Sequence, residues 1–424
     1  MRYLWVDTIC IPTPEIGESY KREDVHQREI MPDIYRGSYV TIVATGRDAQ
    51  IGLYGVQDTK RLPQVRENYS GRTLAIQKPC FEDSVGAWPW SERRWTFQEA
   101  HQPRRLLIFS DEQVFFRCHS GVLTESVHME VPDNERGHVK HRPVDDVWLD
   151  KGKPGLGDAF ISYTQHALKF SSSESSRPSD NVDAFRSYIP VIGPLFHGLP
   201  TSPACTFTIA LWFEVFDGLR ATSERVQVPS WSWLAWKVRD DALYGDWISP
   251  DTVLETSSEN TFCRFWRFEA RTNSTFPGKR NLVPVDPNYH IPVETCGINM
   301  EALTEKETDL AVVAWEVDVL KLQFLNWLED QCLGCAALSL FGSPNENIQS
   351  QIFHATLDPK LDMSCTAEIN AFLLFSNTEG NFLLLVKTND KGISGRVGAC
   401  YISETQWGEN NLTFHMRKDT LVLI

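Results

Sequence analysis

The sequence has 424 residues, of which 42% are hydrophobic and 23% are charged, and its formal net charge is −15. This length and composition predict two or three globular domains, and the acidic balance argues against nucleic-acid binding, which depends on clustered lysine and arginine. No apolar run is long enough for a transmembrane helix and no signal-peptide pattern opens the chain. We therefore expect a cytoplasmic protein with no membrane span and no nucleic-acid partner.

The chain opens with an apolar run at residues 2–11, which is rich in Trp, Val and Ile and is followed by Pro12. Such a run predicts a buried strand. Asp7 interrupts it, and a carboxylate among apolar residues needs a partner. Asp7 is therefore either a site residue that faces a ligand crevice at the end of a strand, or a carboxylate that accepts backbone N–H groups at a turn.

The next segments predict a helix and a second strand. Residues 21–35 carry apolar side chains on one helical face, although Pro32 lies inside this segment. Residues 39–45 (YVTIVAT) are β-branched and predict a strand. The order strand, helix, strand is typical of an α/β domain with parallel pairing. Four apolar residues are expected to be buried in neighbouring strands of its sheet: Val6, Ile9, Ile42 and Val43.

A long excursion and a hairpin are predicted to complete this domain. Residues 46–71 are polar and contain glycine, which indicates an extended loop, and residues 72–77 predict one further strand. Farther along, residues 105–109 and 113–118 predict two strands joined by a polar turn.

Between these segments we predict a short helix at residues 92–101. Ser91 is a typical N-cap residue, and Pro103 ends the helix. A spacing of four residues places Trp95 and Glu99 on one face, so an aromatic ring lies one turn from a carboxylate.

The remainder of the chain divides by pattern. A polar stretch at residues 120–158 predicts a domain boundary, and residues 158–170 and 206–216 show helical patterns. The β-prone segments beyond residue 236 are 311–322, 336–341, 371–375, 382–387, 396–402 and 413–424. We therefore predict an α/β domain at residues 1–150, a helical region at residues 151–235 and a β-rich region at residues 236–424.

Common metal and catalytic signatures are not found. Cys332 and Cys335 have the spacing of half a zinc site, but no second ligand pair with regular spacing lies nearby, so we predict no metal. The 10 cysteines follow no regular spacing, which is typical of reduced thiols. The sequence also lacks the GxSxG, HExxH and GxGxxG patterns of common hydrolases, metalloproteases and dinucleotide-binding proteins.

Two motifs resemble the fungal heterokaryon-incompatibility (HET) domain. The first is RWTFQE, from Arg94 to Glu99, followed by Pro103 and Arg104. The second is YLWVDTICI at residues 3–11. Members of this family usually begin some tens of residues earlier, with a strand that this chain lacks. By this resemblance we expect a HET domain that is truncated at its first strand.

Segments farther along, including residues 228–233 (VPSWSW) and 395–398 (GRVG), resemble stretches that follow the domain in its long members. The resemblance implies a fungal protein of non-self recognition that triggers regulated cell death. It also implies a protein partner or self-association.

The HET domain is in turn similar to Toll/interleukin-1 receptor (TIR) domains, many of which cleave NAD with a glutamate four residues after a tryptophan. Trp95 and Glu99 match that spacing. The resemblance therefore implies a TIR-like fold in which these two residues are catalytic and NAD is the substrate. The other motif residues that would contact a ligand are Asp7, Cys10, Arg94 and Gln98.

An alternative hypothesis needs no catalysis. In it Trp95 is a core anchor, Glu99 pairs with Arg94 or Arg104, and the domain is an interaction module rather than an enzyme. The sequence leaves both hypotheses open.

Overall fold

The computed structural model describes residues 3–11, 18–118, 121–126, 156–173, 184–185, 194–202, 204–213, 219–220, 228–237, 265–268, 282–285, 311–327, 335–340, 353–357 and 368–424. The chain divides into two compact units. The first comprises Met1–Gly152 and Ser173–Tyr188, and the second comprises Lys153–Ser172 and Ile189–Ile424. The division into three parts made from the sequence stays a prediction.

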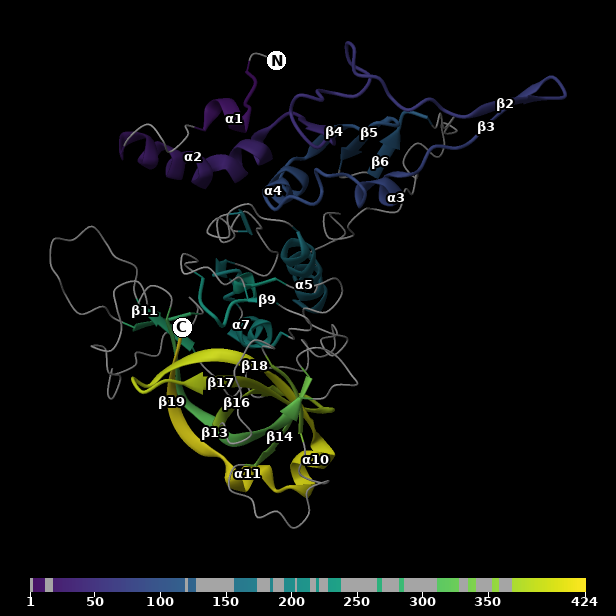
Figure 1. The fold of residues 1–424 in the computed structure, drawn as a ribbon. Coiled ribbons are helices and arrows are strands. Elements are labelled where there is room, and N and C mark those ends of the chain that lie inside the picture. The colour runs from purple at the N-terminus through teal and green to yellow at the C-terminus, as the bar shows by residue number, and fades with distance from the viewer. Residues whose placement is uncertain are drawn as a thin grey trace. The chain divides into compact units, whose positions relative to one another are not determined.

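A four-stranded mixed sheet forms the centre of the first unit (Figure 1). Its order is β1 (Thr41–Ala44), β4 (Arg105–Phe109), β5 (Val114–Cys118) and β6 (Gly121–Thr124). β1 and β4 are parallel, whereas β4, β5 and β6 follow one another in antiparallel order. The predicted strands at residues 105–109 and 113–118 are thus confirmed, and so is the α/β character of this region.

The helices that accompany this sheet include α1 (Asp7–Cys10), α2 (Glu18–Gly37), α3 (Phe81–Val85) and α4 (Thr96–His101). The core residues are Val43, Phe81, Trp88, Trp90, Leu106, Ile108, Phe115 and Val122. α2 contains Pro32, as predicted, and its Arg36 guanidinium donates to the side-chain carbonyl of Gln102 at 3.0 Å. This hydrogen bond links α2 to the residue that follows α4.

The predicted first strand is wrong. Residues 3–6 have no regular structure, and α1 follows them directly. The Asp7 carboxylate accepts the N–H of Thr8 at 2.7 Å, and the Cys10 N–H donates to the Val6 carbonyl at 2.8 Å. An Asp side chain that bonds to a neighbouring N–H favours a turn over a strand, and this local bonding explains the difference.

The predicted burial in neighbouring strands is therefore wrong for Val6, Ile9 and Ile42, and only the burial of Val43 in a strand is confirmed. Ile9 is 81% exposed and Ile42 is 50% exposed, whereas Val43 is buried. The neighbour of β1 in the sheet is β4.

The helix of the RWTFQE motif is shorter than predicted. It begins at Thr96, because the Thr96 hydroxyl donates to the Trp90 carbonyl at 2.7 Å and holds the preceding residues in turns. Ser91 is not its N-cap, since the Ser91 hydroxyl donates to the carbonyls of Val85 and Trp88.

A two-stranded hairpin leaves the sheet of the first unit (Figure 1). It consists of β2 (Arg66–Tyr69) and β3 (Arg72–Ala75), so the predicted strand at residues 72–77 is present and gains a partner inside the predicted excursion. Ser70 and Gly71 form the turn, with φ of 51° and 76°. Two successive residues with positive φ are typical of a tight turn that matches the twist of its strands.

The second unit combines a few helices with a large sheet. The two predicted helices of the middle region are present as α5 (Leu156–Ser172) and α7 (Ala204–Leu211). A 3-10 turn, η4 (Trp233–Ala235), lies in the VPSWSW segment. Within the described ranges, no helix is long and apolar enough to cross a membrane.

The β-rich C-terminal region is confirmed, and six of its strands close into a barrel. The strands are β11 (Phe265–Phe268), β12 (Leu282–Pro284), β13 (Val312–Trp327), β14 (Cys335–Leu340), β15 (Phe353–Leu357), β16 (Glu368–Ser376), β17 (Gly380–Thr388), β18 (Ile393–Ser403) and β19 (Arg417–Leu423). The ring runs β13, β14, β15, β18, β17 and β16, and β16 pairs again with β13. Closure removes free strand edges, and a buried apolar cluster including Leu322, Leu338 and Leu385 fills the core.

A buried arginine joins α7 to the barrel strand β18. Arg396 is 2% exposed, and its guanidinium donates to the carbonyls of Leu211 and Phe213, where α7 ends. It also lies 3.4 Å from the centroid of the Phe213 ring. The Ser230 hydroxyl accepts the N–H of Arg396 at 3.0 Å and donates to the carbonyl of Ile424. The two segments singled out in the sequence, VPSWSW and GRVG, therefore meet.

We expect Arg396→Met to lower the free energy of unfolding by about 2–4 kcal/mol, because two carbonyls at a helix end lose a charged donor and a cation–π contact is lost. Urea unfolding of the full chain followed by tryptophan fluorescence measures the change. Arg417→Ala on the exposed part of β19 is the control, and it should change the free energy by no more than about 0.5 kcal/mol. Equal effects of the two variants would contradict a structural role for Arg396.

Candidate functional site

Glu99 lies on α4 in a partly buried position. Its carboxylate accepts a hydrogen bond from the indole N–H of Trp90, with 2.8 Å between nitrogen and oxygen. Burial raises the pKa of Glu99, the Trp90 hydrogen bond lowers it, the negative charge of Asp7 raises it and the positive charge of Arg93 lowers it. The net direction is upward, so the protonated form of this carboxyl is favoured relative to a glutamate in water.

Tyr35 on α2 responds to the same charged groups. Burial raises the pKa of its hydroxyl, the charges of Glu99 and Asp7 raise it further, and Arg93 lowers it. Such mutual effects require proximity, because screened charges in water interact weakly beyond about 10 Å. Asp7, Tyr35, Arg93 and Glu99 therefore form one group in the first unit, although they come from three helices and a turn. We call this group, together with Trp5 and Trp90, the Glu99 cluster.

Trp5 adds an aromatic wall to the cluster. Its ring meets the Tyr35 ring edge-on, with 5.4 Å between centroids and an interplanar angle of 81°. The indole N–H of Trp5 is buried and has no hydrogen-bond partner among the residues that the structure describes. A buried donor without a partner costs free energy, which a ligand with an acceptor atom would recover.

The cluster has a defined chemical capacity. Two carboxyl groups and a phenol can bind hydroxyl groups, Arg93 can bind an anion, and the indoles offer apolar faces to a ring. A carboxyl with a raised pKa can take up or release a proton nearer to neutral pH than an ordinary glutamate. Among the described residues, no group of three or more His, Cys, Asp and Glu is placed to hold a metal ion.

Comparison with known families decides what this unit is. The family model of the heterokaryon incompatibility protein (HET) matches residues 1–99. The chain carries a HET domain. The match begins at the first residue and ends at Glu99, so it includes every member of the Glu99 cluster. Searches of curated proteins and of solved structures found no match.

Two of the residues predicted from the sequence come together in the HET domain. Asp7 and Glu99 are close enough to influence each other electrostatically, despite their distance in the chain. Cys10 is on the same short helix as Asp7 and is a partly buried free thiol. Trp95 precedes α4 with helical φ and ψ of −64° and −30°, so its side chain starts one turn from that of Glu99.

Arg94 and Gln98 both donate hydrogen bonds to backbone carbonyls. The Arg94 guanidinium donates to the Ser173 carbonyl at 3.0 Å, and burial lowers its pKa to about 10. The Gln98 amide donates to the Ala184 carbonyl at 3.1 Å. These contacts attach α4 to a later segment of the same unit. Whether either residue also contacts a ligand stays a prediction.

The alternative pairing of Glu99 is not observed. Within the described ranges, Glu99 forms no ion pair with Arg94 or Arg104. Its partner is Trp90, a residue that the sequence patterns did not single out. Tyr35 was also missed as a site residue, since it occupies the last position of an apolar helical face and reads as core. Trp5 offered one signal, because it belongs to the YLWVDTICI motif of the family resemblance.

The cluster predicts opposite pKa shifts in two variants. Asp7→Asn removes a negative charge, so the pKa values of Glu99 and Tyr35 should both fall. Trp90→Phe removes a donor to the carboxylate, so the pKa of Glu99 should rise. Titration of carboxyl and tyrosine ring carbons by NMR measures both. Asp33→Asn, at an exposed position of α2, is the control. Equal shifts in the pKa values of Glu99 and Tyr35 in that variant would show that Asp7 has no specific effect.

A second prediction concerns stability and pH. Because the folded pKa of Glu99 lies above its ordinary value of 4.5, the folded state holds this proton more tightly than the unfolded state does. The resulting stabilisation is present below the unfolded pKa and is lost as the pH rises through the folded pKa. Glu99→Gln should therefore gain in melting temperature relative to wild type as the pH rises. A constant difference across the pH range would contradict a raised pKa.

Proposed function

We propose that this chain is a fungal effector of non-self recognition, which triggers regulated cell death through interaction with a protein partner or with itself. The observation that carries the proposal is the match of residues 1–99 to the HET family. Support comes from the way the two motifs fold, since YLWVDTICI supplies Trp5 and Asp7 to the group that contains Glu99 of RWTFQE. The cytoplasm is the proposed site of action.

A second candidate function is favoured by the Glu99 cluster itself. In it the HET domain is a TIR-like NAD glycohydrolase with Glu99 and Trp95 as catalytic residues. The specific observation is that the Glu99 carboxyl is bound by an indole rather than neutralised by Arg94 or Arg104, and that its pKa is raised. These features suit an acid–base residue better than a structural ion pair.

The reaction would proceed as follows. The bond between C1′ of the ribose and the nicotinamide nitrogen breaks, and its electron pair stays with nicotinamide, which leaves as a neutral ring. A water oxygen then bonds to C1′, and the carboxylate of Glu99 accepts the proton of that water. The products are nicotinamide, ADP-ribose and a proton. Asp7 would stabilise the positive charge that develops on the ribose, as carboxylates do in glycoside hydrolysis.

Glu99→Gln separates the two candidates. It keeps the size of the side chain and can still accept from Trp90, but it cannot accept the proton of water. If the HET domain is a glycohydrolase, nicotinamide release from NAD by the purified chain should fall at least about a hundredfold. Cell death should fall with it when wild type and variant are expressed at matched abundance. Glu92→Gln, at an exposed position beside the same motif, is the control and should behave as wild type.

The outcomes are distinct. Undiminished cell death caused by a folded Glu99→Gln variant would contradict the glycohydrolase and favour the interaction module. Wild-type protein that causes no cell death at any level of expression in a fungal host would contradict the effector proposal itself.

A further inference from the structure

The β2–β3 hairpin has one apolar face that is open to solvent. Its register pairs Glu67 with Leu74 and Tyr69 with Arg72, and the N–H of Ile76 donates to the Val65 carbonyl at 3.0 Å. Paired residues share a face and every second pair returns to the same face. One face therefore carries Val65, Tyr69, Leu74 and Ile76, which are 58%, 71%, 58% and 65% exposed.

The opposite face of the hairpin is polar. It carries the pairs of Arg66 with Ala75 and of Asn68 with Thr73. The Thr73 hydroxyl donates to the Asn68 side-chain oxygen at 2.8 Å. The hairpin is thus amphipathic, although no side chain of either strand is buried.

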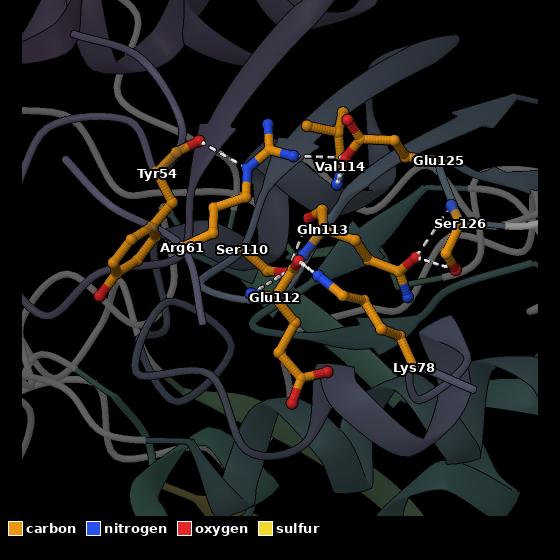
Figure 2. Close-up of polar contacts among 9 residues, drawn as sticks. All are labelled: Tyr54, Arg61, Lys78, Ser110, Glu112, Gln113, Val114, Glu125 and Ser126. Atoms are coloured by element: carbon orange, nitrogen blue, oxygen red, sulfur yellow. Dashed lines mark hydrogen bonds and ion pairs between the residues drawn. The ribbon is translucent and has the colours of Figure 1, made fainter. Parts of the chain in front are cut away.

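Polar contacts hold both ends of the hairpin, and those at the exit of β3 reach the turn between β4 and β5 (Figure 2). On the side that leads into β2, Arg61 donates to the Tyr54 carbonyl and pairs with Glu125. On the side that leaves β3, Lys78 donates to the carbonyl of Glu112 in that turn. These contacts hold the base, so the hairpin is a defined arm rather than a loose loop.

Among the residues that the structure describes, no element buries the apolar face of the arm. The hairpin is a two-stranded sheet, and among the described residues neither strand has a further strand partner. An isolated two-stranded hairpin is at best marginally stable in water, and a hairpin with a large apolar face is stabilised when that face is covered.

The charged residues on the apolar face indicate which kind of partner binds it. Glu67 and Arg72 lie on this face at diagonal positions, and neither forms an ion pair with any described residue. The face is therefore neutral and carries both signs, so it is complementary to itself. A net charge of −15 for the whole chain disfavours an anionic lipid surface or a nucleic acid as the covering partner.

We propose that the β2–β3 arm is a homodimerisation surface, on which the apolar faces of two copies pack against each other. In a two-fold symmetric interface the same patch is used twice. Val65, Tyr69, Leu74 and Ile76 form its apolar centre, and Glu67 of each copy meets Arg72 of the other. This deepens the interaction part of the proposed function, because it names the surface through which the HET protein associates with itself.

Sedimentation velocity of the full chain over a series of concentrations tests the proposal. The wild type should show a reversible equilibrium between monomer and dimer. Leu74→Glu places a charge at the centre of the apolar face and should raise the dimer Kd at least about tenfold. Thr73→Glu is the matched control, since it adds the same charge one residue away on the polar face. It should leave the Kd within about threefold of wild type.

A charge-reversal series distinguishes the loss of the dimer contact from unfolding of the hairpin. Glu67→Arg and Arg72→Glu should each weaken the dimer, because each brings like charges together across the interface. The double variant, Glu67→Arg with Arg72→Glu, restores opposite charges and should recover the wild-type Kd. Recovery of this kind needs both a folded arm and a symmetric contact.

Three results would overturn the proposal: a wild-type chain that stays monomeric at the highest soluble concentration, a dimer that Leu74→Glu and Thr73→Glu affect equally, or a double variant that associates no better than the single ones. The measurement reads association directly, without NAD or cell death. A negative result would therefore overturn the dimer proposal alone, and the cell-death experiment would still test the effector proposal.

Discussion

The hydrogen bond from the Trp90 indole to the Glu99 carboxylate connects the core of the first unit to its candidate site. Trp90 is buried with Ile108 and Phe115 of the central sheet, and only its N–H is directed to a polar partner. The packing of the sheet thereby sets the position of the carboxylate. The charge of Glu99 on α4 also raises the pKa of Tyr35 on α2, after the larger effect of burial. Burying a polar group without a partner costs free energy, and the hydrogen bond to Glu99 removes that cost for the Trp90 N–H.

Sequence patterns predicted the helices and strands whose conformation follows from the periodicity of their own apolar side chains. The β4–β5 hairpin and α5 follow from local periodicity, as do most barrel strands. The first segment was misread because its composition is that of a strand, whereas one Asp bond to a neighbouring N–H redirects the backbone at Asp7. α4 starts late for a similar reason, since the Thr96 hydroxyl binds a carbonyl six residues earlier. Such bonds are decided by geometry, which periodicity does not contain.

The candidate site shows the same limit. The family resemblance identified Asp7 and Glu99, and the structure brings their charges together. The resemblance gave no indication that Trp90 would bind Glu99, because a tryptophan is most often a core residue. Here Trp90 packs in the core and also donates to Glu99. The exposed apolar face of β2–β3 could not be predicted either. It depends on the pairing of Glu67 with Leu74, which requires a turn at Ser70 and Gly71. The composition of residues 46–71 indicates only an extended loop.

The chain passes from the first unit to the second at α5, returns for Ser173–Tyr188, and then leaves again. The returning segment supplies the carbonyls that Arg94 and Gln98 bind, and the Phe185 ring stacks on Phe97 at 5.5 Å. Neither unit is thus a continuous piece of sequence. A fragment ending at residue 152 would lack the carbonyls and the ring that α4 contacts, so the first unit acquires its full set of internal contacts only after the ribosome has also made the first helix of the second unit.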